Sequence, residues 1–413
     1  MQLNLFDKPT NELPDGNGKI TAEALFEAYF TCRKNKRNTY NALAFELDYE
    51  HNLVELLYKI NRGTYRPRRS LAFIIDKPVK REIFAADFRD RVVHHLLINK
   101  LNPYFEKEFI YDSYACRTGK GTHFGIDRAD TFIRKCSENY KSDCYILKLD
   151  IEGFFMHINR YILFERLQQL IKNKYHENDR LLVTELCRIV IFNDPANNCI
   201  IKGRKKDWEG LPDNKSLFHS PSHCGLPIGN LSSQIFANFY MSNFDHFIKS
   251  KLGIRYYGRY VDDFIIVHKD KDYLTSLIPV IAEFLQSDLQ LTLHPKKIVL
   301  QHYNKGLQFL GAVIKPGRIC VANRTRSNFY TAIQKQNAIV RSCKPDKAQQ
   351  AHFLSSMNSY LGIMKHYKTY RLRKKMMTRL SAWWWNYAYI SGGIAKFVFK
   401  RKPVRKAWLR YYS

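Results

Sequence analysis

The sequence has no long hydrophobic segment. Its 413 residues contain no run of about 18 apolar residues, the length that a membrane-spanning helix needs. The first residues, Met1 to Asp7, also lack the charged start and the apolar stretch of a secretory signal peptide. The sequence therefore favours neither a membrane-spanning protein nor a secreted one.

Closely spaced cysteine pairs are absent too. The nine cysteines are an odd number, they are widely scattered, and no two of them form a Cys-x-x-Cys pair. Such a set favours neither a disulfide framework nor a zinc site. Reduced, buried thiols in a cytosolic protein are the simplest interpretation.

Acidic residues are few compared with basic ones. The chain has 67 Lys and Arg against 38 Asp and Glu, and its formal net charge is +29. An excess of this size indicates a polyanionic partner, either nucleic acid or an anionic membrane surface. Because the sequence has no membrane segment, nucleic acid is favoured. The hydrophobic content of 45% is enough for the cores of two or three domains, which excludes a chain that is disordered throughout.

The positive charge is concentrated near the C-terminus. Residues 341–413 contain 17 Lys and Arg against one acid, Asp346, which gives this stretch a net charge of +16. Tyrosines and tryptophans are interleaved with the cations. We interpret the stretch as part of a basic helical domain that contacts the backbone of nucleic acid, largely independently of base sequence.

Apolar periodicity predicts a chain of mixed helices and strands. Helical spacing is found at 25–30, 53–60, 90–101, 160–189 and 275–290, and a helix is expected after Leu231. Strand-like segments lie at 71–75, 144–150, 254–267 and 307–314. Between Asn193 and Cys224 the periodicity fails, which predicts a long basic surface loop or insertion.

Two of the predicted strands carry carboxylates at their ends. Asp262 and Asp263 are adjacent in a predicted hairpin bend, and Asp150 ends another apolar strand. An Asp-Asp pair in a turn is by itself most often a solvated hairpin tip. If the two strands pair, however, the three carboxylates meet in an all-oxygen cluster suited to Mg²⁺. Such a cluster can hold two ions about 4 Å apart, one to activate a 3′-hydroxyl and one to neutralise pyrophosphate.

These carboxylates stand in two recognisable motifs. Asp150-x-x-x-Phe154-Phe155 and Tyr260-Val261-Asp262-Asp263 resemble, in the same order, the two metal-binding motifs of reverse transcriptases. The resemblance extends over residues 60–380 and implies an α+β right-hand polymerase fold with fingers, palm and a helical basic thumb. It implies an N-terminal arm and helices at 1–60, fingers at 61–140, a palm with the basic insertion at 141–316, and a thumb with a C-terminal extension at 317–413.

The resemblance also implies which residues bind metal and nucleotide. It implies two Mg²⁺ ions, which Mn²⁺ can replace, and their ligands are Asp150, Ile151, Asp262 and Asp263. The triphosphate of the incoming nucleotide is expected at Lys77, Lys80 and Arg81. A guanidinium binds phosphate through two hydrogen bonds, and an ammonium adds a mobile point charge. The alternative interpretation of these cations is a solvated hairpin tip.

Three further expectations rest on the same resemblance. Phe155 matches the aromatic residue that lies under the incoming sugar and leaves no room for a 2′-hydroxyl; the alternative is an ordinary core aromatic. Lys297 matches a general acid toward pyrophosphate, and the alternative is a surface lysine without a phosphate contact. The hairpin with Phe309, Leu310 and Gly311 matches the primer grip.

One motif narrows the family. The segment from Gly225 to Gln234 stands where most reverse transcriptases have the motif Gln-Gly-x-x-x-Ser-Pro. Here Ile228 replaces the first Gln, Gly229 is kept, and Gln234 replaces the final Pro. The resemblance implies that these three residues contribute to nucleotide binding. This form is similar to reverse transcriptases of diversity-generating retroelements, which copy a template RNA with errors at adenines. Isoleucine cannot donate the hydrogen bonds of glutamine, and a tenfold loss of discrimination needs only about 1.4 kcal/mol. The alternative is a packing change without effect on fidelity.

We therefore expect a cytoplasmic RNA-directed DNA polymerase, bacterial or phage-encoded, that binds template RNA, the RNA–cDNA duplex and dNTPs. The resemblance also implies a small basic accessory protein as a partner and mutagenic retrohoming as the process. A retron, group II intron-like or phage-defence reverse transcriptase is one alternative. A catalytically silent RNA-binding protein on a polymerase scaffold is another, from a different class.

Overall fold

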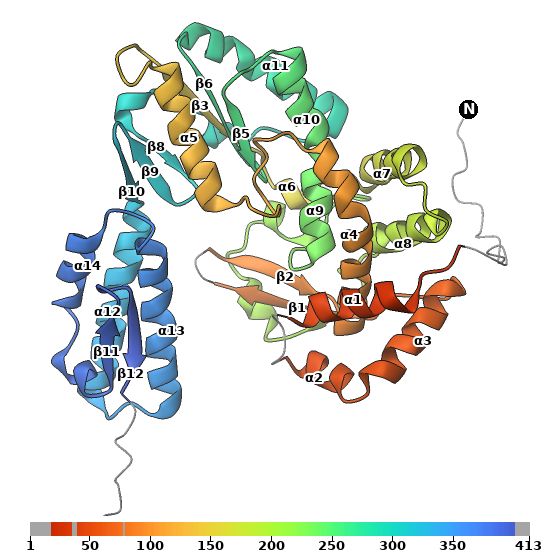
Figure 1. Cartoon of the computed structure of the whole chain (residues 1–413), viewed down its shortest axis with the longest axis horizontal. Coiled ribbons are helices and arrows are strands. Elements are labelled where there is room, and N and C mark those ends of the chain that lie inside the picture. The colour runs from red at the N-terminus through yellow and green to blue at the C-terminus, as the bar shows by residue number, and fades with distance from the viewer. Residues whose placement is uncertain (1–17, 35–38, 77–78, 401–413) are drawn as a thin grey trace, which may run out of the picture. The chain divides into compact units, whose positions relative to one another are not determined.

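The chain folds into two compact units. The computed structural model describes residues 18–34, 39–76 and 79–400. One unit comprises residues 1–128 with 145–300, and the other comprises residues 129–144 with 301–413. Figure 1 labels their helices and strands. Within the described ranges, no helix is long and apolar enough to cross a membrane.

The first unit begins with helices that the sequence predicts. α1 (Ala22–Arg33) starts after Thr21, whose hydroxyl accepts a hydrogen bond from the Ala24 amide. α3 (Tyr49–Asn61) ends shortly before Gly63, where φ is +68°. Such a backbone conformation favours glycine and stops a helix.

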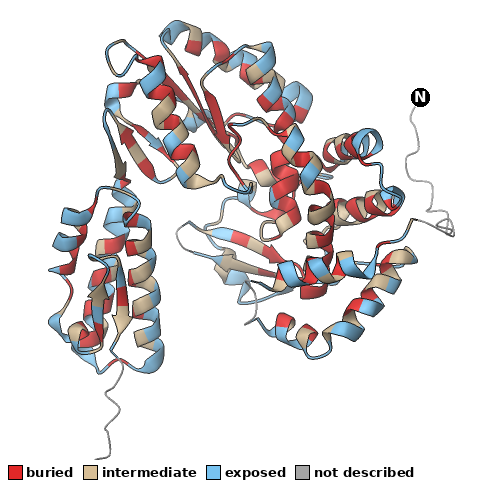
Figure 2. Cartoon of the chain, viewed as in Figure 1, coloured by how far each residue is buried: buried red, intermediate tan, exposed pale blue. Residues whose placement is uncertain are grey.

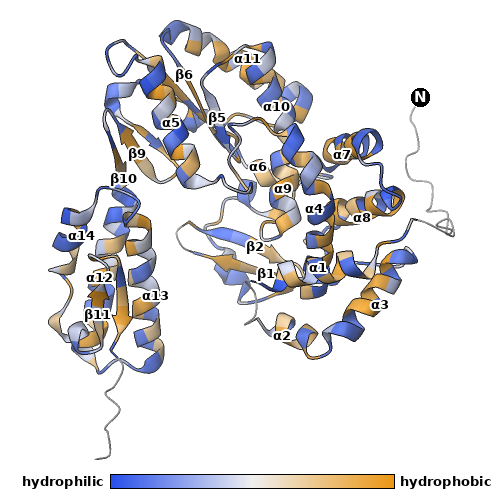
Figure 3. Ribbon diagram, viewed as in Figure 1, coloured by the Kyte–Doolittle hydropathy of each residue, from blue (hydrophilic) through white to orange (hydrophobic). Residues whose placement is uncertain are grey.

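The long helix α4 (Phe88–Glu108) lies at the centre of this unit. Helices α1, α2 (Tyr40–Glu46) and α9 (Leu231–Tyr240) pack against it. α4 and α9 are largely buried, and α8 presents a continuous hydrophobic face (Figures 2 and 3). The periodicity does not predict α2, because seven residues span only two turns.

A three-stranded sheet in the order β2-β1-β4 carries the predicted basic hairpin. β1 (Ser70–Ile75) and β2 (Arg81–Ala85) are antiparallel, and β4 (Cys199–Ile201) pairs with β1 in parallel. The insertion, residues 193–224, therefore differs from the predicted surface loop because it adds a strand to this sheet. Three residues are too few to show strand alternation in the sequence. The insertion also contains three turns of 3₁₀-helix: η1 (Lys205–Trp208), η2 (Asp213–Lys215) and η3 (Leu217–His219).

A four-stranded sheet carries the predicted carboxylates. Its strand order is β5-β6-β3-β7, with β5 (Tyr257–Tyr260), β6 (Asp263–His268), β3 (Tyr145–Asp150) and β7 (Val299–His302). α11 (Lys271–Leu289) packs against β3 and β6. The other elements of this part of the chain are α5 (Thr122–Cys136), α6 (Phe154–His157), α7 (Arg160–Lys174), α8 (Arg180–Phe192), α10 (Ser242–His246), the π-turn η4 (Phe247–Lys251) and η5 (Pro295–Lys297).

The second unit combines helices with two small sheets. Among the described residues, its helices are the C-terminal part of α5, from residue 129 on, and α12 (Asn323–Ser342), α13 (Lys347–Met364) and α14 (Tyr370–Met377). One sheet consists of β8 (Leu307–Phe309), β9 (Ala312–Lys315) and β10 (Arg318–Val321) and follows the 3₁₀ turn η6 (Tyr303–Lys305). The other sheet consists of β11 (Ala388–Ser391) and β12 (Lys396–Phe399) and follows the 3₁₀ turn η7 (Ala382–Asn386).

The second unit differs in one respect from a purely helical domain. Its core includes Trp384, which is fully buried and stacks on Phe353 with ring centroids 3.9 Å apart. The β11–β12 hairpin packs on the same core, so the aromatic residues that the sequence interleaves with cations hold this unit together. The division into four parts at residues 60, 140 and 316 stays a prediction, since the two compact units divide at residues 128, 144 and 300.

Candidate active site

The predicted pairing of the two carboxylate-bearing strands is confirmed. β3 and β6 are antiparallel, and Asp150 lies directly opposite Asp263. The Cβ atoms of directly opposite residues are about 5 Å apart. The two carboxylates are therefore neighbours although more than a hundred residues separate them in the chain.

Asp262 lies in the tight loop that joins β5 to β6. Tyr260 and Asp263 face each other at the base of this hairpin, so Val261 and Asp262 form the loop. The φ angle is +59° at Val261 and is not positive at Asp262, the pattern of a type II′ turn. A β-branched residue disfavours this region, and such strain costs of order 1–3 kcal/mol. The surrounding structure must therefore hold the turn that presents Asp262.

The carboxyl groups of the hairpin are partly removed from water. Loss of hydration raises the pKa of Asp262 to about 6, and the charge of Asp150 acts in the same direction. Loss of hydration also raises the pKa of Asp263 to about 6, against the opposing effect of the Lys148 ammonium. The site thus concentrates negative charge where water stabilises it poorly, and a bound cation relieves this cost.

Two lysines supply positive charge to the same carboxylates. Lys297 Nζ lies 2.7 Å from Asp150 Oδ1, and Lys148 Nζ lies 3.2 Å from Asp263 Oδ2. The segment before Lys297 is fixed along β3, because the His294 amide donates to the Asp150 carbonyl at 2.8 Å. The sequence predicts Lys297 as a residue of this candidate site, and in the structure its ammonium contacts Asp150. It does not predict Lys148.

The donors at this site fit Mg²⁺. Asp150 and Asp262 offer carboxylate oxygens, and Ile151, whose side chain is buried and has no donor atom, offers only its backbone carbonyl. The Oδ1 atom of Asp263 is buried and makes no hydrogen bond to the described residues. Across the described ranges, no three His, Cys, Asp or Glu side chains form a ready metal site. The ammonium groups of the two lysines lie beside two of the carboxylates. They neutralise part of the negative charge that a bound metal ion would also neutralise.

Two of the residues predicted to bind the nucleotide share one small hydrophobic cluster. Phe155 and Ile228 are half-buried, and both pack against the core formed by Ala72, Phe84 and their neighbours. The Phe84 amide donates to the Ile228 carbonyl at 2.8 Å. At Gly229, where φ is +126°, a Cβ atom would lie only 2.9 Å from the side chain of Ile83. This glycine therefore lets the motif approach β2 closely.

The three predicted triphosphate cations have different surroundings. Arg81 is exposed at the start of β2, and its charge, with that of Lys297, partly opposes the rise in the pKa of Asp262 that burial causes. Lys80 instead donates to the Glu209 carbonyl of the insertion at 2.7 Å. Lys77 lies outside the described residues. Of the two that the structure describes, Arg81 is the one whose charge acts on the carboxylates.

The remaining predicted residues belong to different units: Gln234 to the first, and the three residues of the predicted primer grip to the second. Gln234 is exposed on α9, and its side-chain oxygen accepts a hydrogen bond from the Cys116 thiol at 3.2 Å. Phe309, Leu310 and Gly311 belong to the second unit, where Phe309 is buried. Leu310 and Gly311 form the β8–β9 turn with φ angles of +49° and +83°, as in a type I′ hairpin. Gly311 is exposed and Leu310 half-buried, whereas the Phe309 side chain is buried.

The hydrogen bonds around Glu82 form a network that the sequence does not predict. Glu82, on β2 beside Arg81, is 1% exposed. Its carboxylate accepts hydrogen bonds from Trp208 Nε1 at 2.7 Å, from the Ser216 hydroxyl at 2.8 Å and from the Leu217 amide at 2.5 Å. All three donors belong to the insertion. The only signal in the sequence is an acidic residue at an inward-facing strand position, where a charge needs partners.

Comparison with known proteins places this geometry in a family. Residues 75–314 match the family described as "Reverse transcriptase (RNA-dependent DNA polymerase)". This stretch is more than half of the chain and contains all three aspartates. The chain belongs to this reverse transcriptase family. The predicted reverse transcriptase family and the α+β polymerase fold are therefore confirmed, whereas the narrower assignment to diversity-generating retroelements stays a prediction.

Individual relatives of this reverse transcriptase are distant. It is 30% identical to nuclear intron maturase 1, mitochondrial, of Arabidopsis thaliana over 87 residues, which cover 21% of this chain and 11% of the maturase. It is 21% identical to the protein YkfC of Escherichia coli (strain K12) over 255 residues, which cover 54% of this chain and 60% of YkfC. The chain thus spans less than two thirds of either relative.

Similar solved structures include fungal telomerases. The telomerase of Candida albicans in complex with a fragment of telomeric RNA aligns with a TM-score of 0.46 and 12% identity, over 83% of this chain and 64% of that one. The truncated apo telomerase of Candida tropicalis aligns with a TM-score of 0.44 and 15% identity, over 66% and 60% of the two chains.

Proposed function

We propose that this reverse transcriptase is an RNA-directed DNA polymerase that extends a primer with dNTPs on an RNA template. The observation that carries the proposal is the placement of Asp150 opposite Asp263, beside the Asp262 turn and in contact with Lys297. Mg²⁺ bound by these aspartates would supply the charge that activates a 3′-hydroxyl and stabilises the leaving pyrophosphate.

The side chains around the carboxylates have complementary tasks. Arg81, exposed on β2 and electrostatically close to Asp262, binds the triphosphate of the nucleotide. Lys297 holds a proton beside Asp150 that can be passed to pyrophosphate. Phe155 presents a ring fixed by the surrounding cluster, and this ring excludes a 2′-hydroxyl. The basic α12–α14 helices bind the template–primer duplex through its phosphates.

We further propose that synthesis is error-prone at template adenines, as in mutagenic retrohoming by a diversity-generating retroelement, with a small basic accessory protein as partner. The support is Ile228, which replaces a hydrogen-bonding glutamine with an apolar side chain that packs in the cluster with Phe155. A group II intron-like function is the second candidate, and the similarity to an intron maturase favours it.

The decisive experiment is primer extension on an RNA template that contains adenines, with sequencing of the products. We expect Mg²⁺-dependent cDNA from the wild type. Asp262→Asn should lower the rate by at least about 10³-fold, which corresponds to about 4 kcal/mol of transition-state stabilisation. RNA binding and the melting temperature of this variant should change little. Near-normal extension by Asp262→Asn would overturn the site assignment.

The same products separate the candidate functions. Errors concentrated opposite template adenines support the diversity-generating type, whereas an even, low error spectrum favours the intron-like type. RNA binding without any extension by the wild type would instead identify a catalytically silent RNA-binding protein.

A further inference from the structure

A fully buried ion pair lies directly behind the Asp262 turn. Arg259 on β5 and Asp245 on α10 are both 0% exposed. Arg259 Nε donates to Asp245 Oδ1 at 2.7 Å, and Arg259 Nη2 donates to Asp245 Oδ2 at 2.6 Å. The two parallel hydrogen bonds fix the plane of the guanidinium.

The third nitrogen of this guanidinium reaches the active-site turn. Arg259 Nη1 donates to the Val261 carbonyl at 2.8 Å. Val261 is the residue whose positive φ makes the turn strained, and the next residue is Asp262. The hydrogen bond therefore holds the peptide group that joins Val261 to Asp262 in the orientation that the turn requires.

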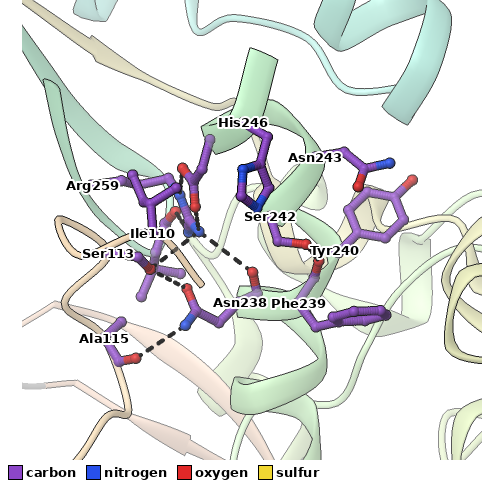
Figure 4. A network of polar contacts seen from close by, with 12 residues as sticks. Ile110, Ser113, Ala115, Asn238, Phe239, Tyr240, Ser242, Asn243, His246 and Arg259 are labelled. Atoms are coloured by element: carbon purple, nitrogen blue, oxygen red, sulfur yellow. Dashed lines mark hydrogen bonds and ion pairs between the residues drawn. The ribbon is translucent and has the colours of Figure 1, made fainter. Parts of the chain in front are cut away.

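The anchor of the guanidinium is itself fixed. The Tyr257 hydroxyl donates to Asp245 Oδ1 at 2.6 Å. Arg259 Nη2 also approaches the Ser113 hydroxyl and the Asn238 carbonyl at 3.4 Å each, contacts that Figure 4 shows from close by. The backbone is held as well, because the Arg259 amide donates to the Asp112 carbonyl at 2.9 Å. Arg259 thus has a defined position from which to act on the turn.

A stabilising role alone does not account for this arrangement. A buried ion pair contributes little more to folding than well-packed apolar residues of the same volume. An apolar pair, however, offers no donor to the Val261 carbonyl. We infer that Arg259 is a positioning residue, which transmits the rigid Asp245 anchor to the Val261 turn and so orients the Asp262 carboxylate toward metal. The inference rests on the proposed polymerase function.

The test compares a variant that disturbs the bond from residue 259 to the Val261 carbonyl with a variant that keeps this bond. Arg259→Lys keeps the charge that Asp245 needs, but one ammonium cannot hold both Asp245 oxygens and the Val261 carbonyl. Tyr257→Phe removes a bond to Asp245 and leaves the bond from Arg259 to Val261 in place. For both variants we measure the melting temperature, and kcat and KM for dNTP in primer extension. We also measure Mn²⁺ binding without nucleotide by electron paramagnetic resonance.

We expect Arg259→Lys to lower kcat about 10-fold or more and to weaken Mn²⁺ binding by a similar factor, with the KM for dNTP nearly unchanged. Tyr257→Phe should lower the melting temperature but leave kcat and Mn²⁺ binding within about twofold of wild type. Adding Val261→Gly to Arg259→Lys should restore most of the lost Mn²⁺ binding and kcat, because glycine adopts a positive φ without strain.

Two results would overturn the inference. One is a loss of activity in both variants in proportion to their loss of melting temperature. The other is unchanged Mn²⁺ binding in a folded Arg259→Lys protein. If the wild type itself does not extend a primer, the proposed function fails, while the Mn²⁺ measurements still decide whether Arg259 positions Asp262.

Discussion

At the scale of single residues, the raised pKa values of Asp262 and Asp263 link metal binding to pH. Both carboxyl groups titrate near pH 6 in the folded protein, chiefly because they lose hydration. In the unfolded chain they titrate near pH 4. Between these values the unfolded chain holds fewer protons than the folded one. The free energy of unfolding of the metal-free protein therefore falls as pH rises from about 4 to 6, and the cost is complete above pH 6.

This charge cost predicts a pH-dependent stabilisation by metal. Mg²⁺ competes with protons for the same oxygens, so millimolar Mg²⁺ should raise the melting temperature at pH 7.5 and much less at pH 5.5. We expect a rise of roughly 2–4 °C, the shift that about 1 kcal/mol produces in a domain of this size. Differential scanning fluorimetry measures it, with Asp262→Asn as the control that should lose most of the effect. An equal rise at both pH values contradicts the assignment.

A second residue-scale prediction concerns fidelity. The backbone of Ile228 is fixed by its bond to Phe84, so a new side chain at this position should leave the backbone in place. Ile228→Gln restores an amide near the nascent pair and should lower misincorporation opposite template adenine by up to about tenfold, equivalent to about 1.4 kcal/mol. Sequencing of the cDNA measures this. Ile228→Leu keeps the site apolar and serves as the matched control; an unchanged error spectrum in Ile228→Gln counts against the hypothesis.

At the scale of elements, the insertion holds the strand that carries Arg81 through hydrogen bonds, a contact that we call the brace. Glu82 binds three donors of the insertion, and Asn214 of the insertion donates to the side chain of Glu152 at 3.0 Å. Glu152 follows Asp150-Ile151, the segment predicted to bind metal. The insertion therefore contacts both the strand that carries Arg81 and the segment that follows Asp150, which a plain surface loop would not do.

The brace predicts a measurable effect of Trp208→Phe. This variant keeps the ring packing against Phe218 and removes one hydrogen bond to the buried Glu82 carboxylate. It should lower the free energy of unfolding by about 1–3 kcal/mol and raise the KM for dNTP, since β2 is less firmly held. Urea denaturation and steady-state kinetics measure the two effects. Lys206→Ala, an exposed change in the same turn, should alter neither; equal effects of both variants would contradict the brace.

At the scale of the whole molecule, the uneven charge predicts a salt-dependent grip on nucleic acid. The stretch after residue 340 carries a net charge of +16 out of +29; α14 contributes four of its cations, whereas α13 contributes one. Backbone contacts release counterions, so affinity for an RNA–DNA duplex should fall linearly on a log–log plot against salt, by roughly 0.9 per phosphate neutralised.

Two lysines on α14 allow a test of this electrostatic contribution to nucleic acid binding. Lys374 and Lys375 are both exposed there. Replacing both with alanine should lower the salt slope by up to about 2 and weaken binding to all duplex sequences alike. Fluorescence anisotropy at several salt concentrations measures the slope. The matched control replaces both with arginine and should keep it. A slope that does not change in the alanine variant would show that these cations do not contact phosphate.

The polymerase part of the fold was largely predictable from the sequence, because its signals are local. The apolar runs of β3 and β6 and the hairpin bend at Val261 predict strands that end in carboxylates. α2, β4 and the β11–β12 hairpin were not predictable, since elements of three to seven residues carry too little periodicity. At the site, the carboxylates and Lys297 could be predicted from motifs, whereas Lys148 and Glu82 have no local pattern that distinguishes them from other charged residues.

The sequence by itself determined the chemical groups and their order along the chain, and with them the reverse transcriptase family. Tertiary structure decided which of these groups meet: Asp150 with Asp263 across two strands, Glu82 with the insertion, and Arg259 with both Asp245 and the Val261 carbonyl. The physical reason is that periodicity reports whether a side chain is buried, but not what it is buried against. The partners of a buried charge are set by packing between segments far apart in the chain, and at this site those partners hold the aspartates in place.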